Sequence, residues 1–140
     1  MGLISKKAGI EHIDTNIVIR LIAQDNERMT KKAEKLLSKK DKTFVFEDAA
    51  MMEVVFVLTR GGYNFTRKET ADSINAFLKT ENIYCNKGLI EDALNLFVKH
   101  PKLSFVDCYL AAITELSQEK PLWTLDKTLA KKLPSVAREL

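Results

Sequence analysis

Short runs of β-branched and aromatic residues alternate with longer amphipathic segments, and this alternation constrains the fold more than any other feature. Strands are expected at 9–14, 43–47, 82–86 and 122–126, with a fifth in the C-terminal SVAREL. Helices are expected at 15–23, 27–39, 48–60, 66–80, 88–99 and 104–118. Strands that alternate with helices of this length are typical of βαβ units.

We therefore expect an α/β protein: a three-layer α/β/α sandwich built on a short, mostly parallel sheet of five strands. The chain of 140 residues shows no internal repeat, no low-complexity tract and no linker rich in proline or glycine. A chain of this length can bury a substantial core without disulfides or structural metals. We expect one domain over residues 1–140.

Composition and charge exclude several classes of protein. The net charge of +3 excludes a strongly basic protein that coats nucleic acid, and leaves room for a modest basic face. No apolar run approaches the roughly 18–20 residues that a membrane span needs, and the N-terminal apolar run is too short for a signal peptide. Cys85 and Cys108 form no CxxC motif or Cys/His cluster, and are expected to be free, buried thiols. We expect a cytoplasmic protein with no membrane contact.

Local signals mark several helix ends. Thr66 followed by Glu69 has the pattern of a capping box, and Ser104 followed by Asp107 has it in a looser form. The pair Gly61-Gly62 is expected to end the helix 48–60.

Four acidic residues stand out by their position along the chain. They are Asp14 after the first strand, Glu53 one turn into the helix 48–60, Asp107 in the first turn of the helix 104–118, and Asp126 at the end of the strand 122–126. In a parallel sheet, the carboxyl ends of the strands and the N-termini of the following helices meet at one edge. We expect the four carboxylates to converge there.

The apolar surroundings of these acids favour a metal site. Glu53 and Asp107 each have large apolar neighbours on both sides, in MMEVVF and FVDC, so both are expected to be partly buried. Clustered carboxylates repel one another unless a cation neutralises them. Oxygen ligands without a His/Cys cluster favour Mg²⁺ or Mn²⁺ over zinc. Two such ions could activate a water and stabilise the leaving oxygen of a phosphoryl displacement.

Three of the four acids also have a structural interpretation. Asp14 and Asp107 can stabilise helix N-termini, and Asp126 can cap a final short helix. Glu53 has no such role, because nothing in a helix interior between apolar residues requires a carboxylate.

Four segments in order, DTN, EVVFVL, FVDCYLAA and TLDKTLAKKL, resemble the four motifs of PIN-domain nucleases. The resemblance covers nearly the whole chain and is strongest to the VapC-type toxins of toxin–antitoxin pairs. It implies an α/β/α sandwich and a Mg²⁺- or Mn²⁺-dependent endoribonuclease that hydrolyses RNA phosphodiesters by metal-activated water, leaving 5′-phosphate and 3′-hydroxyl ends. It also implies a homodimer and a cognate antitoxin that occupies or distorts the site.

By the same resemblance, the metal ligands are Asp14, Glu53, Asp107 and Asp126. Asn16 and Thr124 match the supporting polar positions of the motifs. The chain departs from the family pattern in two places. Cys108-Tyr109 stands where the family frequently has a small residue. Glu47-Asp48 adds two carboxylates that the motifs do not contain. We interpret Asp48 as a helix N-cap and Glu47 as an exposed residue.

Other polar and aromatic residues receive simpler interpretations. Arg20, Arg60 and Arg67 are candidates for RNA contact, because the guanidinium group binds phosphate in a bidentate manner. Contact with a partner protein or with solvent is the alternative for each. His12 is expected to be a packed, neutral strand histidine, and Trp123 a core residue.

Two alternative functions remain open. A Mg²⁺-dependent phosphotransfer domain also places an Asp after its first strand, although His12 stands where aspartyl-phosphate phosphatases have a second Asp. A catalytically silent PIN-like module that only binds RNA or protein is the other alternative, and the presence of all four acids argues against it.

Overall fold

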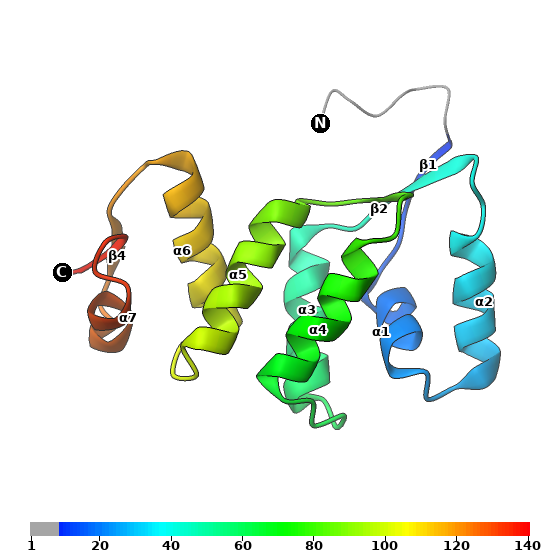
Figure 1. Cartoon of the computed structure of the whole chain (residues 1–140), viewed down its shortest axis with the longest axis horizontal. Helices are drawn as coiled ribbons and strands as arrows, with labels where there is room; N and C mark the ends of the chain where they lie inside the picture. Colours follow the sequence, from blue (N-terminus) through cyan, green and yellow to red (C-terminus); the bar gives the residue numbers. More distant parts are fainter. Residues whose placement is uncertain (1–8) are drawn as a thin grey trace. The chain divides into compact units, whose positions relative to one another are not determined.

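The computed structural model describes residues 9–140, which contain seven helices and five short strands (Figure 1). The α/β class with parallel strands alternating with helices is confirmed. The N-terminal apolar run, which is too short for a signal peptide, lies outside the described residues. The chain divides into two compact units: the first ends at Cys85 and the second runs from Asn86 to Leu140.

The first unit contains a three-stranded parallel sheet in the order β1-β2-β3. Its elements are β1 Gly9–His12, α1 Thr15–Ala23, α2 Glu27–Leu37, β2 Lys42–Val45, α3 Asp48–Arg60, α4 Arg67–Leu78 and β3 Ile83–Tyr84. His12 pairs with Val45, and Val45 with Tyr84, so the three strands end together at their carboxyl edge. The helices α1 and α3 both begin at this edge, because each follows one of these strands.

Apolar stripes of the helices form the core of the first unit. Val18, Leu58 and Ile74, from α1, α3 and α4, have no exposed surface. Phe46 follows β2 and packs edge-on against Phe77 of α4, with ring centroids 5.8 Å apart. This packing fixes α1 and α3, and with them the residues at their N-termini.

The second unit is built on the helix pair α5 and α6 and on a two-stranded parallel sheet. Its elements are α5 Lys87–Lys99, α6 Phe105–Ser117, β4 Leu122–Thr124, α7 Lys127–Lys132 and β5 Ala137–Glu139. Leu94, Leu103 and Cys108 are fully buried in it. Phe97 and Phe105 join α5 to α6, with ring centroids 5.6 Å apart.

The five expected strands are present, three in the sheet of the first unit and two in that of the second. One five-stranded sheet, its three layers and the single domain over 1–140 stay predictions. Within residues 9–140, no helix is long and apolar enough to cross a membrane.

The expected helix-end signals are largely confirmed. Both capping boxes are present, and α3 ends at Gly61-Gly62, where Gly62 takes a φ of 101°. That φ favours glycine because a side chain is strained there. The prediction of Asp48 as N-cap is wrong by one residue: Glu47 holds that position and Asp48 is the first residue of α3.

The predictions for His12 and Trp123 are wrong. The side chain of His12 is 67% exposed, and Trp123 is 55% exposed. The physical reason is the same for both: β1 and β4 each pair with a single strand and lie at the edge of the sheet of their own unit. Of the two cysteines, Cys108 is buried as expected and Cys85 is only half-buried, so the prediction of burial is confirmed for Cys108 alone.

Candidate metal centre

Asp14 lies at the carboxyl edge of the three-stranded sheet and caps α1. The backbone N–H of Ile17 donates to Asp14 Oδ1 at 3.4 Å. Next to it, the Thr15 hydroxyl donates to the carbonyl oxygen of Ala50 at 3.4 Å, which joins the start of α1 to the first turn of α3. Asp14 therefore stands beside the N-terminal part of the helix that carries Glu53.

Glu53 is exposed, so the prediction of partial burial is wrong. Its apolar neighbours in sequence, such as Val54 and Val55, face the core on the opposite side of α3. The residues that share its face are Phe56, which is 60% exposed, and the exposed Arg60, at helical spacings of three and seven. Within residues 9–140 the Glu53 carboxylate forms no hydrogen bond or ion pair, which leaves both oxygens available to a ligand.

Asp107 is half-buried, as expected, and is the third residue of α6. Its backbone N–H donates to the Ser104 hydroxyl oxygen at 3.1 Å, and its Oδ2 accepts from the Ser104 backbone N–H at 3.4 Å. The capping interpretation of Asp107 is therefore confirmed, and it employs one of the two carboxylate oxygens.

Asp126 caps the short helix α7, as its structural interpretation predicted. Its Oδ1 accepts from the backbone N–H groups of Thr128 at 2.8 Å and Leu129 at 3.2 Å. The hydroxyl oxygen of Thr124 accepts from the Asp126 backbone N–H at 2.9 Å. Thr124 thus fixes the turn that presents Asp126 at the carboxyl end of β4.

The geometry makes capping and metal coordination compatible. Asp14 and Asp126 cap through Oδ1 and Asp107 through Oδ2, so each keeps one oxygen without a hydrogen bond in the described part of the chain. None of the four acids forms an ion pair within residues 9–140. Unpaired carboxylate oxygens are the donors that Mg²⁺ and Mn²⁺ prefer. The donor set therefore fits a hard divalent cation.

The four acids are divided between the units. Asp14 and Glu53 belong to the first unit, and Asp107 and Asp126 to the second. In the described part of either unit, no three His, Cys, Asp or Glu side chains lie close enough together to hold a metal ion. Neither unit alone forms the four-carboxylate site, which stays a prediction.

Arg20, a candidate for RNA contact, is engaged with residues that the sequence did not point to. Its Nη1 donates to Asp25 Oδ1 at 2.8 Å, and the Tyr63 hydroxyl donates to Asp25 Oδ2 at 2.8 Å. The hydrogen bond from Tyr63, followed by that from Arg20, lowers the pKa of Asp25, and the bond to Asp25 raises the pKa of Arg20 and of Tyr63. These three residues join the end of α1 to the loop before α4. Asp25 and Tyr63 are 38 positions apart, so no local pattern could reveal the hydrogen bond between them.

Asn16 and Arg60 are exposed and open to a ligand. Asn16 is the second residue of α1, directly after the Asp14 cap. Arg60 stands in the last turn of α3, on the face that carries Glu53. Both stay predictions, Asn16 as a supporting residue and Arg60 as an RNA contact.

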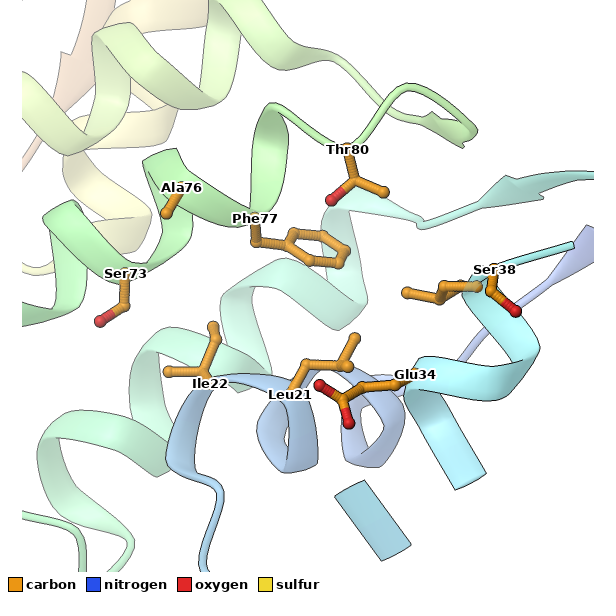
Figure 2. A pocket seen from close by; sticks show the side chains of 9 residues that line it. Leu21, Ile22, Glu34, Ser38, Ser73, Ala76, Phe77 and Thr80 are labelled. Atoms are coloured by element: carbon orange, nitrogen blue, oxygen red, sulfur yellow. The ribbon is translucent and has the colours of Figure 1, made fainter. Parts of the chain in front are cut away.

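The first unit also contains a groove between α1, α2 and α4, with a volume of about 500 Å³ and a lining that is more apolar than polar. Figure 2 shows Leu21 of α1 and Phe77 of α4 pointing toward one another across it, with Glu34 of α2 beside Leu21. Exposed apolar surface of this kind is typical of sites where a segment of a partner protein binds.

A comparison with protein-family models matches residues 12–132 to the PIN domain. The match spans most of the chain and contains all four acids. The chain belongs to the PIN domain family. A comparison with curated proteins gives no match to this chain. PIN domains are typically nucleases and generally use a divalent metal ion.

Membership of the PIN family agrees with the presence of four carboxylates that each have an oxygen available to a cation. The assignment of Asp14, Glu53, Asp107 and Asp126 as the residues that would hold the ion stays a prediction. A divalent ion held by such carboxylates would supply Lewis-acid chemistry for a bound water and for phosphate oxygens. The protein's own contribution is to fix the carboxylates, and here three of the four are fixed by the helix caps that they form.

Proposed function

We propose that this PIN domain is a Mg²⁺- or Mn²⁺-dependent endoribonuclease and the toxin of a toxin–antitoxin pair. The observation that carries the proposal is that all four acids lie within the PIN match and each keeps a carboxylate oxygen free for a cation. The exposed Arg60, on the Glu53 face of α3, is suited to contact the RNA backbone. We propose that the protein acts in the cytoplasm, where the thiols of Cys85 and Cys108 would stay reduced.

The proposed partners are a cognate antitoxin and a second copy of the chain. The groove between α1, α2 and α4 supports a protein partner, because an amphipathic helix can bury its apolar face in such a groove. We propose that an antitoxin segment binds this protein and blocks its activity, and that the nuclease is a homodimer. Light scattering of the protein alone measures whether it is a homodimer, and light scattering with the antitoxin measures whether the two proteins bind.

The test is RNA cleavage by the wild-type protein and by Asp14→Asn, with Mn²⁺ and with a chelator. We expect cleavage by the wild type with Mn²⁺ only, at internal positions, and none by the variant. Expression of the wild type should arrest growth, and expression of the variant should not.

Each failure of this test has its own meaning. Equal RNA binding by both proteins with cleavage by neither would favour a silent RNA-binding module. Cleavage without growth arrest would contradict the toxin role and leave the nuclease intact.

A further inference from the structure

His12 and Glu47 face one another at the carboxyl edge of the three-stranded sheet. His12 is the last residue of β1 and pairs with Val45, and Glu47 comes two residues after Val45. The His12 Nδ1 and Glu47 Oε1 atoms are 3.8 Å apart. Both side chains are well exposed, at 67% and 63%, so this pair is open to a ligand.

Glu47 is placed to cap α3 but does not. It holds the N-cap position, yet its side chain accepts no hydrogen bond from the first turn of α3. Its carboxylate is turned toward the His12 ring instead. Nδ1 is the ring nitrogen that faces the Glu47 carboxylate, so the other nitrogen, Nε2, is the one that stays open to a ligand.

His12 and Asp14 point to the same side of the chain. Ile13 lies between them and is 8% exposed, and the backbone stays extended through Asp14, with φ −99° and ψ 177°. Side chains alternate in extended backbone, so a buried Ile13 directs both of its neighbours away from the core. A ligand bound at Asp14 is therefore within reach of the His12 ring.

We propose that His12 contacts the ribose 2′-hydroxyl of the RNA substrate and selects RNA over polymers that lack this group. The 2′-hydroxyl both donates and accepts hydrogen bonds, so it can pair with Nε2 whether or not that nitrogen carries a proton. Glu47 is a positioning residue that orients the ring. The inference rests on the proposed nuclease function and deepens it by assigning a residue to substrate selection.

The experiment compares cleavage of RNA with cleavage of 2′-fluoro RNA of the same random sequence, both with Mn²⁺. A 2′-fluoro group cannot donate a hydrogen bond. We expect the wild type to prefer RNA by about tenfold in kcat/KM, as for one lost hydrogen bond. The His12→Phe variant should lose this preference, mainly through a higher KM for RNA, and His12→Gln should restore part of it. Glu47→Gln should weaken it.

Glu11→Gln is the matched control. Glu11 precedes His12, and its carboxylate lies 2.8 Å from Lys42 Nζ. This variant should keep the preference of the wild type. An unchanged preference in His12→Phe, or no preference in the wild type, would overturn the inference and leave the nuclease function standing. Absence of Mn²⁺-dependent cleavage of either polymer by the wild type would overturn both.

Discussion

Ser104 and Asp107 cap one another: the Asp107 N–H donates to the Ser104 hydroxyl at 3.1 Å, and the Ser104 N–H donates to the Asp107 carboxylate at 3.4 Å. The same carboxylate is one of the four that the resemblance of the sequence motifs predicts as metal ligands. Its Oδ2 serves the helix and its Oδ1 remains for a cation. One side chain thus has a structural and a proposed chemical role, and substitutions can separate the two.

The first prediction separates these roles at α6. Asp107→Asn should unfold at nearly the same urea concentration as the wild type, because the amide oxygen still accepts the capping bond, but its Mn²⁺ affinity should fall. Ser104→Ala should cost about 1 kcal/mol of unfolding free energy and keep the Mn²⁺ affinity. Urea unfolding and calorimetry measure the two quantities. Equal Mn²⁺ affinity in Asp107→Asn and the wild type would show that Asp107 only caps the helix.

The second prediction concerns acid stability at Asp25. Hydrogen bonds from Tyr63 and Arg20 lower its pKa from the ordinary 3.8, so the folded state prefers the ionised form. The resulting stabilisation is present above the pKa of the unfolded chain and is lost as pH falls through the lower, folded pKa. Asp25→Asn should make the urea midpoint less dependent on pH in this acidic range. A pH profile as steep as that of the wild type would contradict this.

The third prediction concerns alkaline stability at Tyr63. Its hydrogen bond to Asp25 raises the pKa of the hydroxyl above the ordinary 10.0. The folded state therefore prefers the neutral phenol, and the stabilisation, present below the unfolded pKa, is lost as pH rises through the folded one. Tyr63→Phe should lower the urea midpoint at neutral pH and reduce its fall above about pH 10. An unchanged midpoint at neutral pH would show that this hydrogen bond contributes nothing.

The fourth prediction compares two residues in the last turn of α3. Leu58 is fully buried, so Leu58→Ala should cost about 2–5 kcal/mol of unfolding free energy. Arg60 is exposed, so Arg60→Ala should change the unfolding free energy by no more than about 0.5 kcal/mol. If Arg60 contacts phosphate, its variant should also bind RNA more weakly and with a smaller salt dependence. RNA affinity equal to that of the wild type would remove Arg60 from the interface.

Helix caps can be predicted from the sequence because they depend on residues a few positions apart, whereas contacts between distant segments cannot. The capping boxes at Thr66 and Ser104 depend on residues three positions apart, so their patterns were sufficient. The caps formed by Asp14 and Asp126 were predicted as the structural alternative to metal binding, and both are present. The hydrogen bond between Asp25 and Tyr63 joins two loops that are 38 positions apart, so the sequence carries no signal for it.

Burial was the weakest part of the prediction. Glu53 was expected to be partly buried because of its neighbours in sequence, but helical periodicity places Val54 and Val55 on the opposite face. His12 and Trp123 were expected to be packed because they lie in strands. Their exposure depends on which edges of the two sheets are paired, and a single sequence does not specify that.

Metal binding by Glu53 tests the central claim most directly, because this acid is exposed, lies inside a helix and caps nothing. Mn²⁺ is titrated calorimetrically into the wild type, Glu53→Gln and the control Glu91→Gln, which changes an exposed acid of α5. We predict binding by the wild type and the control, and affinity reduced by at least about tenfold in Glu53→Gln, with unfolding free energies within about 0.5 kcal/mol of one another. Equal Mn²⁺ binding by all three proteins, or binding by none of them even with a non-cleavable single-stranded oligonucleotide present, would contradict the carboxylate metal site.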